Sequence, residues 1–336
     1  MRLFLTSRDR CVRLAIRPLS VIAVLAIGGL EHCCATLLLN DTWADGDRTS
    51  TNLPTDSPVW IGMASAGSSS VSPGSLTVTP TTNSAKIWTY FTSDNSAPDG
   101  NQPHNSVLQM GVGDTLTASL TFSVQGITSA GSRNFRLGLF FDPTNARVQT
   151  NTNSDGGGTG NPWQDASGYS MMIPVNTGSG SNPIRLTKRT VVNNSLLGSD
   201  AAHTLPANGG ATYSLANDVT YTASLSLYMV SATQMDVTGT LALGNTILST
   251  LSYSDLGATF GGAAPPSGTQ LPNASSVYTN FDQLFIRLSD NSQFSDVIFS
   301  NFRVEYITAI PEASSFLLFG LVTVLGGGAA WRRRRR

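Results

Sequence analysis

Three aspartates near the start of the chain are the residues best placed to do chemistry. They lie in NDTWADGDRT, residues 40–49, as Asp41, Asp45 and Asp47, and Gly46 permits a tight turn between the last two. Carboxylate oxygens are the ligands that calcium prefers, and a full site takes six to eight oxygens. The pattern predicts a structural calcium ion held by these aspartates. The alternative is an Asp-Gly turn whose charges are hydrated.

A tryptophan in a long polar stretch is a second candidate for binding. Trp163 closes the run NTNSDGGGTGNPW, residues 151–163, whose composition predicts a long loop rather than a domain boundary. An exposed indole offers an apolar face and an N–H donor, as sugar recognition requires. Two roles therefore stay open for Trp163: it binds a ligand, or it packs the loop against the body.

The usual catalytic constellations are missing from the sequence between the two ends. Glycosidases need two facing carboxylic acids, and the only glutamate in this region is Glu305. A serine triad needs a histidine, and His104 and His203 lie in loop-like stretches far from any G-x-S-x-G motif. We therefore expect a protein that is not an enzyme and that has no cofactor beyond structural calcium, although pairs of aspartates elsewhere are left open.

The first 35 residues have the parts of a secretory signal peptide. A basic start is followed by an apolar stretch from Leu19 to Leu30 and by small residues near Ala35, where we expect cleavage. The basic residues are Arg2, Arg8, Arg10, Arg13 and Arg17. All three cysteines precede residue 35, so we expect the mature body to contain no disulfide.

The chain ends in a proline, an apolar run and a basic cluster. Pro311 and Glu312 lead into an apolar segment of 16 residues, Phe316 to Trp331. The cluster that follows is Arg332, Arg333, Arg334, Arg335 and Arg336. A helix of this length spans about 24 Å, which is at the short end for crossing a membrane. Because clustered arginines resist translocation, we expect them to stay in the cytoplasm and the body to lie outside.

This ending resembles the PEP-CTERM sorting signal of Gram-negative bacteria. The typical motif is Pro-Glu-Pro, and this chain has Ala313 in place of the second proline. The resemblance implies that Pro311, Glu312 and the arginine cluster form a sorting motif. It also implies that an exosortase, a membrane-embedded cysteine transpeptidase, recognises and removes the tail. The protein would then pass through the inner membrane and reach the cell surface or the extracellular matrix.

The body between the two ends predicts an all-β fold. In residues 114–124 and 219–229, apolar and hydroxyl side chains alternate, which is typical of antiparallel strands with one buried and one hydrated face. Other strand-like stretches recur between turn clusters, at residues 74–80, 85–92, 134–141, 184–192, 235–243, 245–253, 281–288 and 296–306. About a dozen strands in a body of this size fit one β-sandwich of jelly-roll type.

The stretch from residue 220 to 306 resembles concanavalin- and laminin-G-like jelly rolls, whose members include lectins, carbohydrate-binding modules and structural domains. We therefore divide the chain into a signal peptide (1–35), a β-sandwich ectodomain (36–308) and a sorting tail with a transmembrane helix (309–336). The fold alone does not choose a function.

The charge distribution narrows the choice of partners. Ten of the 20 basic residues but only three of the 21 acidic residues lie in the two ends, so the body has 10 basic and 18 acidic side chains and a net charge of −8. An acidic body argues against nucleic acid as a partner. We expect an exported structural or adhesive protein of exopolysaccharide or biofilm. A carbohydrate-binding module is the first alternative, and an enzyme acting on polysaccharide is the second.

Overall fold

A computed structural model describes residues 35–48, 60–62, 67–81, 84–92, 107–128, 134–142, 163–175, 183–193, 196–197, 203–257, 268–289 and 293–309. All of these lie in one compact unit, Cys34–Ala309, and form strands, turns and loops with no helix among them. No helix within these stretches is therefore long and apolar enough to cross a membrane. The predicted signal helix and transmembrane helix lie outside the described residues.

The strands account for most of the described chain. In chain order they are β1 (Ala35–Asp41), β2 (Ile61–Gly62), β3 (Gly67–Ser72), β4 (Ser75–Pro80), β5 (Ala85–Tyr90), β6 (Leu108–Gln109), β7 (Thr115–Gln125), β8 (Asn134–Phe141), β9 (Ser167–Pro174), β10 (Ile184–Arg189), β11 (His203–Gly209), β12 (Tyr221–Ser231), β13 (Gln234–Leu243), β14 (Thr246–Asp255), β15 (Asn280–Phe281), β16 (Gln283–Leu288) and β17 (Asp296–Ile307).

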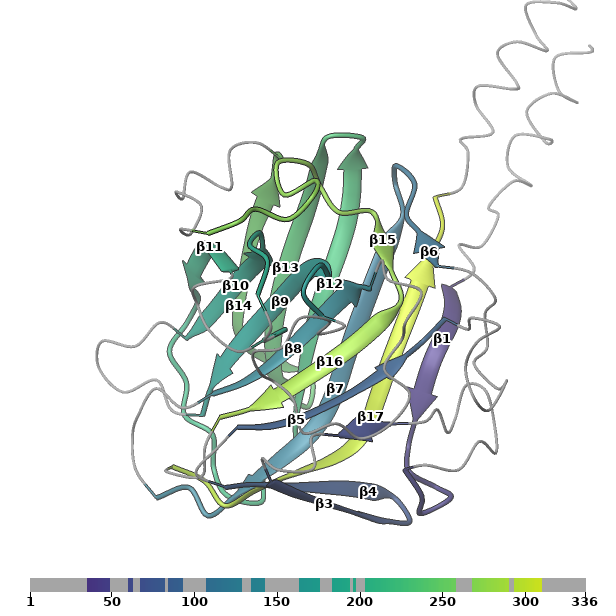
Figure 1. The fold of residues 1–336 in the computed structure, drawn as a ribbon. Helices are drawn as coiled ribbons and strands as arrows, with labels where there is room; N and C mark the ends of the chain where they lie inside the picture. The colour runs from purple at the N-terminus through teal and green to yellow at the C-terminus, as the bar shows by residue number, and fades with distance from the viewer. Residues whose placement is uncertain are drawn as a thin grey trace, which may run out of the picture. The chain divides into compact units, whose positions relative to one another are not determined.

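Two antiparallel sheets form the two layers of a β-sandwich (Figure 1). The eight-stranded sheet has the order β14-β13-β12-β7-β17-β4-β3, and β1 pairs with the second half of β17, next to the half that pairs with β4. The seven-stranded sheet has the order β11-β10-β9-β8-β16-β5-β2, and β6 and β15 form a small pair of their own. The predicted antiparallel, all-β sandwich is confirmed.

Alternating side chains build the eight-stranded sheet as predicted. Along β7 every second residue is buried, from Leu116 to Val124, and the hydroxyl residues between them are half-exposed. Strand β12 pairs with β7 in a continuous register and shows the same alternation. One face of the sheet therefore packs into the core while the other meets solvent.

Apolar side chains from both sheets fill the space between them. Phe122 of β7 meets Phe135 of β8 edge-to-face, with ring centroids 4.5 Å apart. Gly239 of β13 leaves room for Met171 and Leu186 from the opposite sheet, because a Cβ there would lie 2.6 Å from the Met171 sulfur and 2.8 Å from Leu186 Cδ2. The sandwich is closed by direct contact between the layers.

A second apolar cluster covers the other face of the seven-stranded sheet. Trp88 stacks on Phe285 at 5.4 Å between ring centroids, and Trp163 meets Trp88 edge-to-face at 4.8 Å. Trp88 alternates along β5 with Ile87, which belongs to the main core, so it points away from that core. This outer apolar cluster consists of Trp88, Tyr90, Phe140, Trp163, Ala166, Leu196, Leu197 and Phe285. Both faces of this sheet are therefore covered near its middle.

The two ends of the described chain meet on neighbouring strands. Ala35, the first residue of β1, is the register partner of Ile307, the last residue of β17. Two residues after β17, the described chain ends at Ala309. The points where the predicted signal peptide and sorting tail join the sandwich are thus side by side.

Candidate functional site

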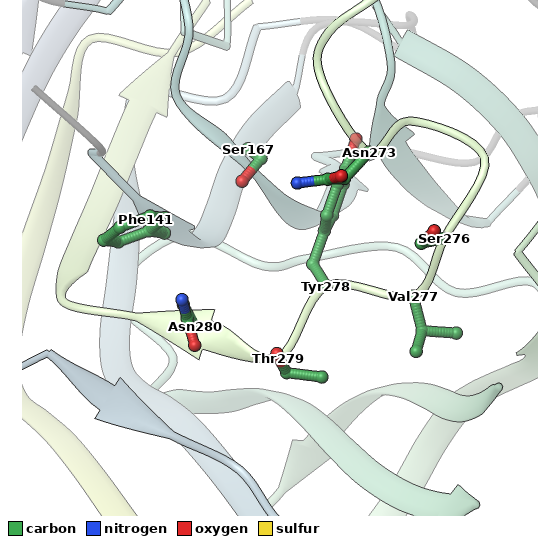
Figure 2. A pocket seen from close by; sticks show the side chains of 8 residues that line it. All are labelled: Phe141, Ser167, Asn273, Ser276, Val277, Tyr278, Thr279 and Asn280. Atoms are coloured by element: carbon green, nitrogen blue, oxygen red, sulfur yellow. The ribbon is translucent and has the colours of Figure 1, made fainter. Parts of the chain in front are cut away.

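A pocket of about 260 Å³ opens beside the end of β8, the start of β9 and the loop that leads into β15 (Figure 2). Phe141 closes β8 and is the register partner of Ser167, which begins β9. The described residues that line the pocket are Phe141, Ser167, Asn273, Ser276, Val277, Tyr278, Thr279 and Asn280. Figure 2 shows Phe141 and Asn280 on one side of the hollow and Ser276 and Val277 on the other.

The loop that supplies most of the pocket is folded into tight turns. Asn273 adopts a positive φ of 64°, a conformation that asparagine tolerates better than most residues. The amide of Ala274 donates to the Leu271 carbonyl at 3.1 Å, and that of Ser276 donates to the Asn273 carbonyl at 2.8 Å. The side chains of Asn273 and Ser276 are left at the surface, next to the pocket.

A buried ion pair holds this loop against the sandwich. The Lys188 ammonium lies 2.7 Å from a carboxylate oxygen of Asp255, and each side chain is 1% exposed. The same ammonium donates to the Ser276 carbonyl at 2.7 Å and lies 4.7 Å above the centre of the Tyr278 ring. One cation thus connects β10, the end of β14 and the pocket loop, so the loop is fixed before any ligand arrives.

Two buried tyrosines complete this network. The Tyr169 hydroxyl donates to Asp255 at 2.6 Å and accepts from the Tyr278 amide at 3.0 Å, while the Tyr278 hydroxyl donates to the Arg189 carbonyl at 2.6 Å. Burial, followed by the charge of Asp255, raises the pKa of both tyrosines above its ordinary value. Burial lowers the pKa of Lys188, and Asp255 opposes that shift. Both tyrosines therefore remain protonated donors at neutral pH.

The pocket suits an uncharged ligand that carries hydroxyl groups. None of the described lining residues is charged, and they offer hydroxyls, amides and the rings of Phe141 and Tyr278. The Asn280 side-chain oxygen is buried and has no hydrogen-bond partner among the described residues. An amide supplies donors and an acceptor that a ligand hydroxyl can satisfy.

The predicted calcium ligands Asp41 and Asp45 take part in hydrogen bonds within the protein. One carboxylate oxygen of Asp41 accepts the amide N–H of Trp43 at 2.8 Å, and the other accepts the indole N–H of Trp60 at 2.6 Å. Asp45 accepts the amide of Asp47 at 3.1 Å in a local turn. The described residues hold no group of three or more His, Cys, Asp or Glu side chains that could bind a metal. Asp41 is a buried acceptor that fixes two tryptophans.

Trp163 packs the loop against the body instead of presenting its ring to solvent. The side chain is 0% exposed and belongs to the outer apolar cluster, in contact with Trp88 and Phe285. A ligand has no free face of this indole on which to stack. Of the two roles that the sequence left open, the geometry favours packing.

Two aspartates that the sequence did not pair come together below the surface. The Asp142 amide donates to a carboxylate oxygen of Asp282 at 3.1 Å, and the Tyr90 hydroxyl donates to Asp142 at 3.4 Å. Their side chains are 4% and 1% exposed, and neither is among the described residues that line the pocket. Glu305 lies on β17 and pairs with Arg303 on the same strand. The described chain thus offers no pair of facing carboxylates around the pocket.

No local sequence pattern indicated the pocket. Its loop reads LPNASSVYTN over residues 271–280, a polar turn-rich stretch like many others in this chain. Its partners Phe141 and Ser167 come from strands more than 100 residues earlier, brought there by the β8–β9–β16 register. The sorting residues Pro311, Glu312 and Arg332 to Arg336 lie outside the described residues.

In comparisons with known proteins, the C-terminal segment matches a sorting-motif family and the body has distant structural likenesses. Residues 309–335 match the family described as a PEP-CTERM protein-sorting motif. No curated protein matches the chain. Similar solved structures include the VIP36 exoplasmic/lumenal domain in its Ca²⁺/Man3GlcNAc-bound form, with 12% identity and a TM-score of 0.44 over 83% of this chain and 91% of that one. Lectin II from Ulex europaeus has 12% identity and a TM-score of 0.40 over 82% and 98%. The Emp47p carbohydrate recognition domain has 9% identity and a TM-score of 0.41 over 82% and 97%.

Proposed function

Because the chain carries a PEP-CTERM protein-sorting motif at residues 309–335, we propose that it is an exported protein delivered by an exosortase-type system. The sandwich is the delivered unit, placed at the cell surface or in the extracellular matrix after passage through the inner membrane. Its role there is structural or adhesive, among exopolysaccharide or biofilm components, and not enzymatic.

The position of the motif relative to the fold is the observation that carries this proposal. The motif begins at Ala309, two residues after the last residue of β17. All described strands therefore precede it, and a cut within the motif leaves every one of them in place. The three cysteines likewise precede β1, so removal of a signal peptide near Ala35 takes no strand from the sandwich.

Intact mass of the protein recovered from the surface or medium of its native host tests the proposal. We expect a mass that lacks about the first 35 residues and the arginine-ended tail. A protein that retains Arg332 to Arg336 would contradict delivery by sorting and would indicate a permanent anchor.

Saccharide binding in the pocket is a second candidate function, favoured by the chemistry of the pocket. Its described lining is uncharged and rich in hydroxyl and amide groups, and its loop is fixed by the Lys188–Asp255 pair. A neutral sugar offers hydroxyls to such groups and an apolar ring face to Phe141. This binding would give an adhesive protein its contact with polysaccharide.

Calorimetric titration with a panel of neutral monosaccharides and disaccharides tests this second function. Ser167→Arg places a long charged side chain at the rim of the pocket and is expected to abolish binding. Thr240→Arg is the matched control, because Thr240 lies on the solvent face of β13 in the other sheet. Equal binding by both variants would show that the sugar binds elsewhere.

A further inference from the structure

The chain is held by a buried carboxylate at the point where the sorting motif begins. The amide of Ala309 donates to one oxygen of Asp114 at 2.7 Å. The other oxygen accepts the amide of Gly111 at 2.6 Å and the hydroxyl of Tyr306. The Asp114 side chain is 7% exposed, so these donors replace most of its contact with water. Three donors on one carboxylate make a strong local restraint.

The surroundings of Asp114 form a close-fitting seat for Ala309. Gly113 has a positive φ of 89°, and a Cβ added there would lie 2.6 Å from the Cβ of Ala309. The Gly113 amide donates to the Met229 carbonyl at 2.7 Å, and the Met229 amide donates to the Asp114 carbonyl at 3.0 Å. The seat is thus attached to β12 as well as to the start of β7, and it forms only when these strands are paired.

The ionisation states suit this arrangement at neutral pH. Burial raises the pKa of the Asp114 carboxyl, but the bonds from Tyr306, Ala309 and Gly111 outweigh burial and leave the pKa below its ordinary value. Burial, with the hydrogen bond and charge of Asp114, raises the pKa of Tyr306. Asp114 is therefore a charged acceptor and Tyr306 a protonated donor under the conditions of export.

The restraint shortens the free chain in front of the sorting residues. With Ala309 held, only Ile310 separates the sandwich from Pro311. Without it, the last residue fixed by the strand ladder is Ile307, and residues 308–310 become free. At about 3.5 Å per extended residue, the reach grows from about 3.5 Å to about 10 Å. A folded domain this close to the sorting residues would hinder an enzyme that has to reach them.

We propose that Asp114 is a latch that holds the start of the sorting motif against the sandwich and thereby slows its processing. This inference rests on the proposed delivery by an exosortase-type system. Asp114 is a positioning residue in that reaction, because it acts on the substrate segment and touches no reacting atom. The rate of release from the membrane is then set by how often Ala309 leaves its seat.

Pulse–chase processing of the full chain in its native host tests the latch. Asp114→Ala is expected to shorten the processing half-life by up to about tenfold, the scale of losing hydrogen bonds to a charged group. Tyr306→Phe removes one of the three donors and keeps the carboxylate, so it should give a smaller acceleration. Asp236→Ala is the matched control, because Asp236 also accepts side-chain hydrogen bonds, from Ser254 and Gln234, but lies on β13. Its half-life should equal that of the unaltered chain.

A variant with an inserted linker distinguishes the effect of the latch from a general loss of stability. Three residues, Gly-Ser-Gly, inserted between Ile310 and Pro311 supply free chain whether or not Ala309 is held. The insertion should accelerate processing as Asp114→Ala does, and the combined variant should be no faster than the insertion alone. Acceleration by Asp114→Ala that persists on top of the linker would overturn the latch, as would an unchanged or longer half-life.

Amide exchange distinguishes failure of the latch from failure of the proposed delivery. In the full chain, the Ala309 amide should exchange about tenfold faster in Asp114→Ala than in the unaltered protein. An unaltered chain that is never cut in its host would refute the proposed delivery itself. A chain that is cut normally but whose Ala309 amide exchanges at the same rate in both variants would refute only the latch.

Discussion

The buried Lys188–Asp255 pair gives the first prediction at the scale of single residues. Lys188→Met leaves Asp255 charged and buried without its cation, which costs about 3–5 kcal/mol in buried pairs of this kind. We expect a loss of this size in the free energy of unfolding, measured by urea denaturation. The combined variant Lys188→Met/Asp255→Leu should recover part of it, because no uncompensated charge remains.

An exposed pair on the other sheet is the matched control. Arg303 and Glu305 form an ion pair on β17, with side chains 46% and 31% exposed. Arg303→Met should change the free energy of unfolding by less than about 1 kcal/mol. Equal losses in the free energy of unfolding for the exposed and the buried substitution would show that the Lys188–Asp255 pair contributes no more to stability than an exposed pair.

Lys86 gives a pH dependence whose sign is fixed by its surroundings. Burial, and then the charges of Arg287 and Arg136, lower the pKa of Lys86 to about 7 from its ordinary 10.5. Both arginines are its cross-strand neighbours, Arg287 directly and Arg136 one strand further. Between these two values the unfolded chain binds the additional proton, so stability rises with pH. Lys188 contributes in the same direction.

We therefore expect the titration of Lys86 to increase the free energy of unfolding as the pH rises from about 7 towards 10.5. Lys86→Met should reduce this rise, because the titrating group is gone. Urea denaturation of both proteins at several pH values measures the two slopes. Identical slopes would contradict the lowered pKa of Lys86.

Asp41 and Trp163 show why side-chain roles were harder to predict than strands. The sequence near Asp41 supplied carboxylates and a glycine, which is what a calcium loop also contains. The Trp60 indole, which donates to Asp41 in the structure, comes from 19 residues away. For Trp163 the polar loop left exposure and packing both open, and Trp88 and Phe285, on separate strands, bury the ring. Both outcomes depend on contacts between segments that no local pattern reveals.

At the scale of elements, alternation predicted the strands that bury only one face, whereas the doubly buried β5 and β16 were predicted as strand-like stretches between turn clusters. Strands β7 and β12 alternate along their whole length, and the structure has them as expected. Strand β9, SGYSMMIP, was not predicted, because nearly all of its residues are buried and alternation is absent. Tyr169, Met171 and Ile173 on one face pack in the main core, and Ser170 and Met172 on the other face are also buried. Double burial removes the period on which strand prediction relies.

The contact between the two sheets gives a prediction for β13. Gly239→Val adds a branched side chain where a Cβ alone would lie under 3 Å from Met171 and Leu186. Overpacking of this kind costs about 1–3 kcal/mol, which thermal unfolding can detect as a lower Tm. Thr240→Val, on the solvent face of the same strand, should leave Tm nearly unchanged. A similar Tm for both variants would mean that the sheets separate easily at this point.

At the scale of the whole molecule, no disulfide bond crosslinks the sandwich. Every cysteine precedes residue 35, so none lies in the sandwich. We expect the Tm of the processed protein to be the same with and without a reducing agent. A fall in Tm on reduction would show that the leader, with its cysteines, remains attached and bonded.

The neighbouring positions of Ala35 and Ile307 determine how the molecule bears force. A tether at its C-terminal end pulls along β17, which is hydrogen-bonded to β7 on one side and to β4 and β1 on the other. Because these bonds lie across the strand, such a load shears both ladders together, and many bonds must break in the same event. A load on the other end acts on β1, which pairs with β17 alone among the described strands, so only one ladder resists it. A surface protein anchored through β17 would therefore withstand flow far better than one anchored through β1.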